Sequence, residues 1–122
     1  MKIPRPIKPT ALGAEKEQLA CRYLMTKGLR LLARNYRCRL GEIDLVMRSR
    51  DILVFVEVRY RRSAGFGTPA ATVGPRKQQR LANAARHYLL HHPSTLPCRF
   101  DVLAISGPDA IDWIQDAFSV DS

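Results

Sequence analysis

The segment over residues 41–59 constrains the fold of this chain more than any other part of the sequence. Two apolar stretches rich in β-branched residues flank a short polar turn centred on residues 50–51. This pattern predicts a tight β-hairpin. In such a hairpin, Asp44 lies directly across from Glu57, with Cβ atoms about 4.5 to 5.5 Å apart. Arg59 follows Glu57 by two residues and therefore shares its face of the strand.

Two carboxylates facing each other on apolar strands repel and lose solvation unless a cation lies between them. Their oxygen atoms suit Mg²⁺ or Mn²⁺, and such an ion supports phosphodiester hydrolysis by activating a bound water. Asp44 and Glu57 are therefore candidate metal ligands. The alternative is a structural ion pair of these acids with Arg39, Arg59 or Arg61.

Glu17 is a candidate third metal ligand. It shares the inward stripe of a helix predicted over 13–27, where an acid is unusual. The alternatives are a partly buried acid paired with an arginine and a residue near the helix start that the helix dipole favours.

The remaining pattern predicts one α/β domain over residues 13–122, preceded by a flexible basic arm over residues 1–12 that contains three prolines. A strand over 29–36 precedes the hairpin, and a mobile loop follows it over 61–72. A second helix begins at Pro75 and ends before Pro93. Strands over 99–105 and 111–115 complete a mixed five-stranded sheet flanked by helices, with the second helix as the crossover to a parallel strand.

The net charge of +9, from 20 Lys and Arg against 11 Asp and Glu, favours nucleic acid as a partner. An ordinary solvated face is the alternative for these basic residues. No apolar run is long enough to cross a bilayer, and we expect a cytoplasmic protein whose three cysteines stay reduced. The candidate nucleic-acid-binding residues are Arg39, Arg61, Arg62, Arg76, Lys77 and Arg80.

Several fragments together carry a resemblance to a known family. They are Glu17-Gln-Leu-Ala, Ala33-Arg-Asn-Tyr-Arg, Gly41-Glu-Ile-Asp-Leu-Val, Val54-Phe-Val-Glu-Val-Arg-Tyr-Arg-Arg, Lys77 and Arg99-Phe-Asp-Val. With them the chain resembles the bacterial YraN family, which is similar to archaeal Holliday junction resolvases of the PD-(D/E)xK nuclease superfamily. The resemblance implies a restriction-endonuclease-like core in which Glu17, Asp44 and Glu57 hold metal. The chain departs from the Glu-x-Lys signature, because Arg59 replaces the lysine.

These observations predict a nucleic-acid-binding protein that acts as an Mg²⁺- or Mn²⁺-dependent endonuclease on structured or branched DNA. Asp44, Glu57 and Arg59 are the candidate catalytic residues. DNA is preferred over RNA, and a homodimer would suit a four-way junction, although no sequence feature defines its interface. The alternative is a non-catalytic nucleic-acid-binding or protein-interaction module that lost turnover through Arg59, since arginine keeps the charge but cannot act as a base.

Overall fold

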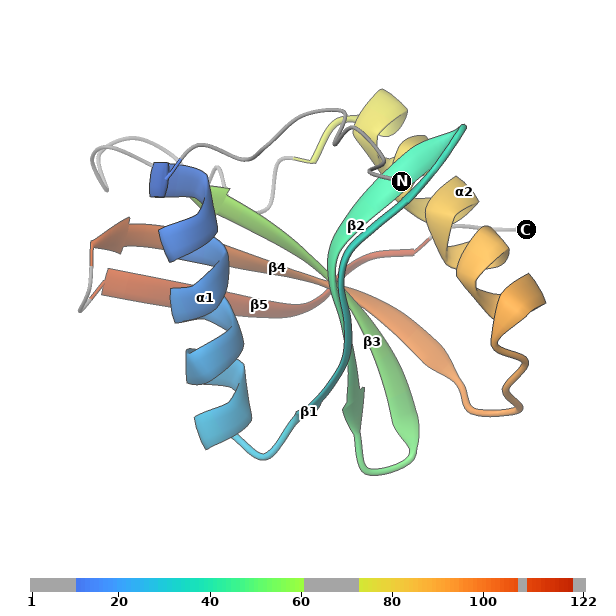
Figure 1. Ribbon diagram of the computed structural model, residues 1–122, viewed down its shortest axis with the longest axis horizontal. Coiled ribbons are helices and arrows are strands. Elements are labelled where there is room, and N and C mark those ends of the chain that lie inside the picture. The colour runs from blue at the N-terminus through green and yellow to red at the C-terminus, as the bar shows by residue number, and fades with distance from the viewer. Residues whose placement is uncertain (1–10, 61–72, 108–109, 120–122) are drawn as a thin grey trace, which may run out of the picture.

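Two helices cover opposite faces of a five-stranded sheet (Figure 1). The computed structural model describes residues 11–60, 73–107 and 110–119. The elements are α1 (Ala11–Thr26), β1 (Arg30–Cys38), β2 (Gly41–Ser49), β3 (Ile52–Tyr60), α2 (Pro75–His91), β4 (Cys98–Gly107) and β5 (Ala110–Phe118). The strands lie in chain order across the sheet, with β3 and β4 parallel and every other neighbouring pair antiparallel.

This architecture confirms the predicted α/β class, the mixed sheet and the crossover through α2. α1 starts at Ala11, two residues before the predicted helix and inside the predicted arm. Residues 1–10 of that arm and the predicted loop over 61–72 lie outside the described residues. Neither described helix combines the length and the apolar character needed to cross a membrane.

The core consists of two apolar clusters, one on each face of the sheet. α1 contributes Ala20 and Leu24 to the first cluster, which includes Leu45 and Val56 of the hairpin. α2 contributes the buried part of its predicted stripe to the second cluster, which includes Phe55. Because β3 is buried from both sides, its sequence is nearly continuous in apolar residues.

Local signals set the ends of both helices. Gly28, with φ of 95°, follows α1 in the left-handed region, and the Leu29 N–H donates to the Leu24 carbonyl oxygen at 3.2 Å. These are features of a Schellman motif. Pro75 occupies the first turn of α2, where its missing N–H costs no helical hydrogen bond.

The predicted hairpin register is confirmed. β2 and β3 pair from Ser49↔Ile52 to Leu45↔Val56, so a two-residue turn joins them. Arg50 in that turn has φ of 55°, as primed hairpin turns require. One further step in this register brings Asp44 opposite Glu57.

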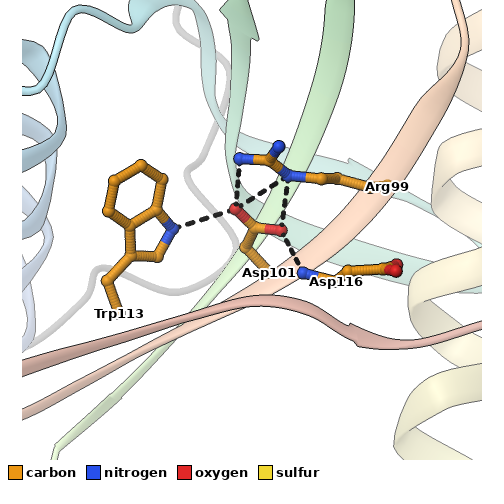
Figure 2. A network of polar contacts seen from close by, with 4 residues as sticks. All are labelled: Arg99, Asp101, Trp113 and Asp116. Carbon is orange, nitrogen blue, oxygen red and sulfur yellow. Dashed lines mark hydrogen bonds and ion pairs between the residues drawn. The ribbon is translucent and has the colours of Figure 1, made fainter.

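A buried aspartate fixes the pairing of β4 with β5 (Figure 2). The fully buried Asp101 carboxylate accepts two hydrogen bonds from Arg99 Nε, at 2.9 and 3.2 Å, and one from Arg99 Nη2 at 3.1 Å. It also accepts hydrogen bonds from Trp113 Nε1 and from the Asp116 backbone N–H, each at 2.9 Å. Asp116 has φ of 52° and lies where the register shifts between Phe100↔Phe118 and the next pair. Asp101 therefore stabilises a bulge in β5.

Gly41 is required by a close approach of the β1–β2 turn to α2. A Cβ atom at Gly41 would overlap the backbone carbonyl oxygen of Arg80. Because that oxygen belongs to helical backbone, it cannot move away without disturbing α2.

We expect Gly41→Ala to lower the free energy of unfolding by at least about 2 kcal/mol, because the added methyl group overpacks this contact. Gly74→Ala is the matched control, since a Cβ atom there meets nothing within 4 Å. Gly74→Ala should lower the free energy of unfolding by less than about 1 kcal/mol, because alanine is a poorer N-cap residue than glycine. Denaturant unfolding of both variants measures the difference, and equal stability of the two would contradict the close contact.

Asp101→Asn should lower the free energy of unfolding by about 3–5 kcal/mol. The amide NH₂ group would face N–H donors instead of accepting from them, and the charge of Arg99 would lose its carboxylate partner. Asp112→Asn applies the same change to an exposed position on β5 and should stay within about 0.5 kcal/mol of the parent. Thermal or denaturant unfolding of the pair of variants checks this. A small effect of Asp101→Asn would show that the β5 bulge does not depend on the carboxylate.

Candidate functional site

The candidate site lies where the β2–β3 ladder ends. Beyond the last paired rung, Leu45↔Val56, the backbone N–H of Val58 donates to Asp44 Oδ2 at 2.8 Å. A side-chain hydrogen bond also joins the Asp44 and Glu57 carboxyl groups. The structure thus brings the two predicted acids together as the hairpin register requires.

The surroundings of both acids favour their protonated forms. Burial and the negative charge of Glu57 raise the pKa of Asp44 to about 7, despite the opposing effects of the Val58 N–H and Lys77. Burial also raises the pKa of Glu57, while Lys77, Asp44 and Arg59 oppose that rise. The pair therefore lies in an environment that disfavours two full negative charges side by side.

Lys77 is the cation in contact with Glu57. Its Nζ lies 3.6 Å from Glu57 Oε2, and its side chain is partly exposed. The sequence analysis assigns Lys77 only to the nucleic-acid-binding surface and misses its contact with Glu57. The predicted crossover was the sequence signal that pointed to this contact. A helix that follows β3 starts near the end of that strand, and Glu57 lies near the same end.

An open cavity of about 440 Å³ borders this cluster. Glu57, Arg59 and Lys77 line it together with Tyr60 and Gly74 at the start of α2. The positive charge of Arg59 acts on Glu57, as the shared strand face predicts. The Lys16 ammonium from α1 lies 3.0 Å from the centroid of the Tyr60 ring. Within the acid pair, Glu57 is therefore buried but borders the open cavity.

Glu17 lies on the other side of Asp44 and is only half-buried. Burial raises the pKa of Glu17, a hydrogen bond from Asn35 lowers it, and the charge of Asp44 raises it. Arg34 and Arg37 also act on this carboxylate and lower its pKa. Glu17 is thus close enough to Asp44, Arg34 and Arg37 for their charges to act on it, and its role stays a prediction.

Asn35 is a site residue that the sequence analysis missed. It falls between the pairs Arg34↔Leu45 and Tyr36↔Ile43, across from Asp44, and has φ of 51°. Asparagine tolerates this left-handed backbone better than most residues. The asparagine in the middle of a predicted strand was the one sequence feature that could have indicated this left-handed residue.

Asp44 and Glu57 have the chemistry of a site for a hard cation. A divalent ion would compensate for the burial that raises the pKa of both acids and for the charge of Glu57 that raises the pKa of Asp44. Mg²⁺ commonly binds one or two carboxylates while keeping waters. Among the described residues, however, no group of three or more acid, histidine or cysteine side chains is close enough to enclose a metal ion. Asp44 and Glu57 are the residues that would hold Mg²⁺ or Mn²⁺, and Glu17 as a third ligand stays a prediction.

The predicted nucleic-acid-binding residues do not all lie at this site. Arg76 is exposed in the first turn of α2 beside Lys77, and Arg80 Nη2 lies 3.9 Å from Glu42 Oε1. Arg39 lies in the β1–β2 turn and borders a different cavity, on the outer face of α2. Arg61 and Arg62 fall outside the described residues.

The raised pKa of Asp44 predicts a loss of stability as the pH rises. The unfolded carboxyl group releases its proton near 3.8 and the folded one near 7, so the folded state holds more protons between these values. The free energy of unfolding should therefore fall as the pH rises from about 5 to about 8. In Asp44→Asn this fall should be smaller, because the amide mimics the protonated acid.

Denaturant unfolding of the parent and of Asp44→Asn at both pH values measures this difference. Glu42→Gln on the same strand is the matched control and should retain the parental pH dependence. An unchanged pH dependence in Asp44→Asn would contradict the raised pKa of Asp44.

Comparison with known proteins identifies the family. Residues 16–105 match the model of the uncharacterised protein family UPF0102. A UPF0102 protein of Nitrosococcus oceani is 54% identical over 115 residues, covering 90% of this chain and 93% of the relative. A UPF0102 protein of Ralstonia nicotianae is 53% identical over 124 residues, covering 98% and 95% of the two chains. The match includes α1 from Lys16, the hairpin and α2, and the chain therefore belongs to the UPF0102 family, which confirms the resemblance to YraN proteins.

Proposed function

We propose that this protein is an Mg²⁺- or Mn²⁺-dependent nuclease that hydrolyses phosphodiesters in structured or branched DNA. The observation that carries the proposal is the convergence of two carboxylates and a lysine beside an open cavity. Asp44 and Glu57 come from neighbouring strands, and Lys77 reaches Glu57 from a helix. In the same proposal the fold is restriction-endonuclease-like and the protein works in the cytoplasm, where DNA is accessible.

Lys77 can take the role of the signature lysine that Arg59 replaces. The Glu-x-Lys signature of the resembling nucleases places a lysine next to the second acid, and this chain has Arg59 there. The Lys77 ammonium lies 3.6 Å from the same acid. A lysine ammonium is a compact point charge on a flexible stem, whereas an arginine guanidinium is a bulkier planar group. We assign the lysine role to Lys77 and charge stabilisation to Arg59.

Each residue has a defined role in this scheme. Asp44 and Glu57 would hold the ion, which when bound supplies a more acidic water and shields the phosphate charge. Asp44 would bind the ion as a carboxylate, and the Val58 N–H holds its Oδ2 in place. Lys77 and Arg59 put positive charge beside the non-bridging oxygens of the phosphate, where negative charge accumulates.

The start of α2 would orient the backbone of the substrate. Arg76 and Lys77 lie in its first turn, where free backbone N–H groups favour an anion. The net charge of +9 supplies long-range attraction to DNA. Two copies of the site in a homodimer would match the two scissile strands of a four-way junction.

A specific observation supports the alternative of a non-catalytic DNA-binding module. Glu57 already has Lys77 and Arg59 as cationic neighbours, and both lower its pKa. A site neutralised in this way does not require a metal ion. DNA binding without turnover would then be the whole function.

We expect purified protein to cut labelled four-way junctions or flaps in Mg²⁺ or Mn²⁺, and Glu57→Gln to abolish the cutting. Linear duplex and RNA of equal length test the substrate preference. Glu42→Gln, which removes an acid from the same sheet, should keep full activity. DNA binding without metal-dependent cutting in any substrate would overturn the nuclease proposal and support the non-catalytic module.

Lys77→Met should lower the cleavage rate at least about 100-fold, as expected for loss of a charge that stabilises the transition state. Arg76→Met removes a neighbouring charge that does not contact Glu57 and should mainly weaken binding. In the double variant Lys77→Met, Arg59→Lys, partial recovery of the rate would show that a lysine beside Glu57 is what matters. Parental activity in Lys77→Met would remove Lys77 from the mechanism.

A further inference from the structure

A second cavity, of about 770 Å³, lies between the β1–β2 turn and the outer face of α2. We call it the turn–helix groove. The residues of interest in its lining are Arg37, Arg39, Leu40, Asn83, Arg86 and Leu90. Its volume is within the range of about 300–1,000 Å³ that is usual for ligand sites. None of Asp44, Glu57 and Lys77 lines it, so it is separate from the acid pair.

The walls of the turn–helix groove are held together by specific contacts. Asn83 Nδ2 donates to the Leu40 carbonyl oxygen at 3.3 Å, and Asn83 Oδ1 accepts from Arg86 Nη1 at 3.3 Å. Tyr36 and His87 form a hydrogen bond of 2.6 Å across the same junction. The close approach of Gly41 to α2 fixes the turn itself. A ligand would therefore meet a preformed site and lose little free energy to ordering it.

The charge of the groove is positive. Three arginines and a histidine line it, and no acid does. Within residues 11–60, 73–107 and 110–119, neither Arg39 nor Arg86 forms an ion pair with a carboxylate. These guanidinium groups are available for bidentate hydrogen bonds to carboxylates of a partner.

Two leucines make the groove apolar as well as basic. Leu40 is 64% exposed and Leu90 is 76% exposed, the largest exposed fractions among the large hydrophobic side chains described. They come from the turn and from the end of α2, so the groove has apolar side chains on both walls. Large apolar side chains exposed around one concave site are typical of interaction surfaces.

We propose that the turn–helix groove binds an acidic peptide segment of a partner protein that carries leucine- or phenylalanine-sized side chains. Carboxylates of the segment pair with Arg39 and Arg86, and its apolar side chains pack on Leu40 and Leu90. A second copy of this chain is disfavoured as the occupant, because it brings the same net charge of +9. Single-stranded DNA is disfavoured because stacking of bases calls for aromatic platforms, and leucines form the apolar walls here.

The test uses a fluorescein-labelled peptide, Asp-Asp-Leu-Asp-Phe-Leu-Glu-Asp, and fluorescence anisotropy with the full chain. We expect saturable binding that weakens at least about tenfold in Arg86→Glu and in Leu90→Ser, as for interface residues that anchor a ligand. Both side chains are exposed, so the variants should unfold at the parental temperature. Arg22→Glu and Met25→Ser make the same changes at exposed positions of α1 and should bind the peptide like the parent.

Two altered peptides define the chemistry of the ligand. The peptide with Asn and Gln in place of its acids, and the peptide with Ser in place of its apolar residues, should each bind at least about tenfold more weakly. Equal binding of either altered peptide would overturn the proposal, as would parental affinity in both groove variants. Binding of a single-stranded oligonucleotide that depends on Arg86 and Leu90, without peptide binding, would assign the groove to nucleic acid instead. These outcomes are read from binding and not from DNA cleavage. Either the peptide proposal or the nuclease proposal can therefore be contradicted without the other.

Discussion

The burial of the β2–β3 hairpin from both sides is the constraint on which the rest of the structure depends. Leu45 and Val56 face the α1 cluster, and Phe55 faces the α2 cluster. A strand pair buried in this way offers little solvated surface for acids along its paired length. Asp44 and Glu57 are accommodated only because the ladder ends beside them and an open cavity borders Glu57. The fold therefore determines where a charged site can exist in this sheet.

Asp101, which is buried, and Asp44, which is half-buried, show opposite ways of accommodating a carboxyl group in the sheet. Asp101 accepts hydrogen bonds from Arg99, Trp113 and the Asp116 backbone, so its charge is fully compensated by donors (Figure 2). Asp44 has one backbone donor and an acid as its other neighbour. A carboxylate surrounded by donors gains stability from its position, whereas an acid next to an acid loses it. By this contrast Asp101 supports the fold, and Asp44 is the better candidate for chemistry.

Much of the fold was predictable from the sequence because its signals are local. The hairpin register follows from a short turn between two apolar runs, and that register alone placed Asp44 against Glu57. Pro75 and Gly28 marked helix ends for equally local reasons. Lys77 and Asn35 were missed because their partners are distant in sequence. The contact of Lys77 depends on how α2 docks on the sheet, and the contact of Asn35 depends on how β1 bends. Residues nearby in sequence determine neither.

The crossover from β3 through α2 to β4 also sets the order in which the site can assemble. A hairpin with a two-residue turn brings the acids together through contacts that are near in sequence, and such contacts form early in folding. Lys77 can join them only when α2 docks on the sheet. A nascent chain that ends before α2 thus contains the acids without the lysine. The complete cluster is a property of the finished fold, and a partly folded chain does not yet possess it.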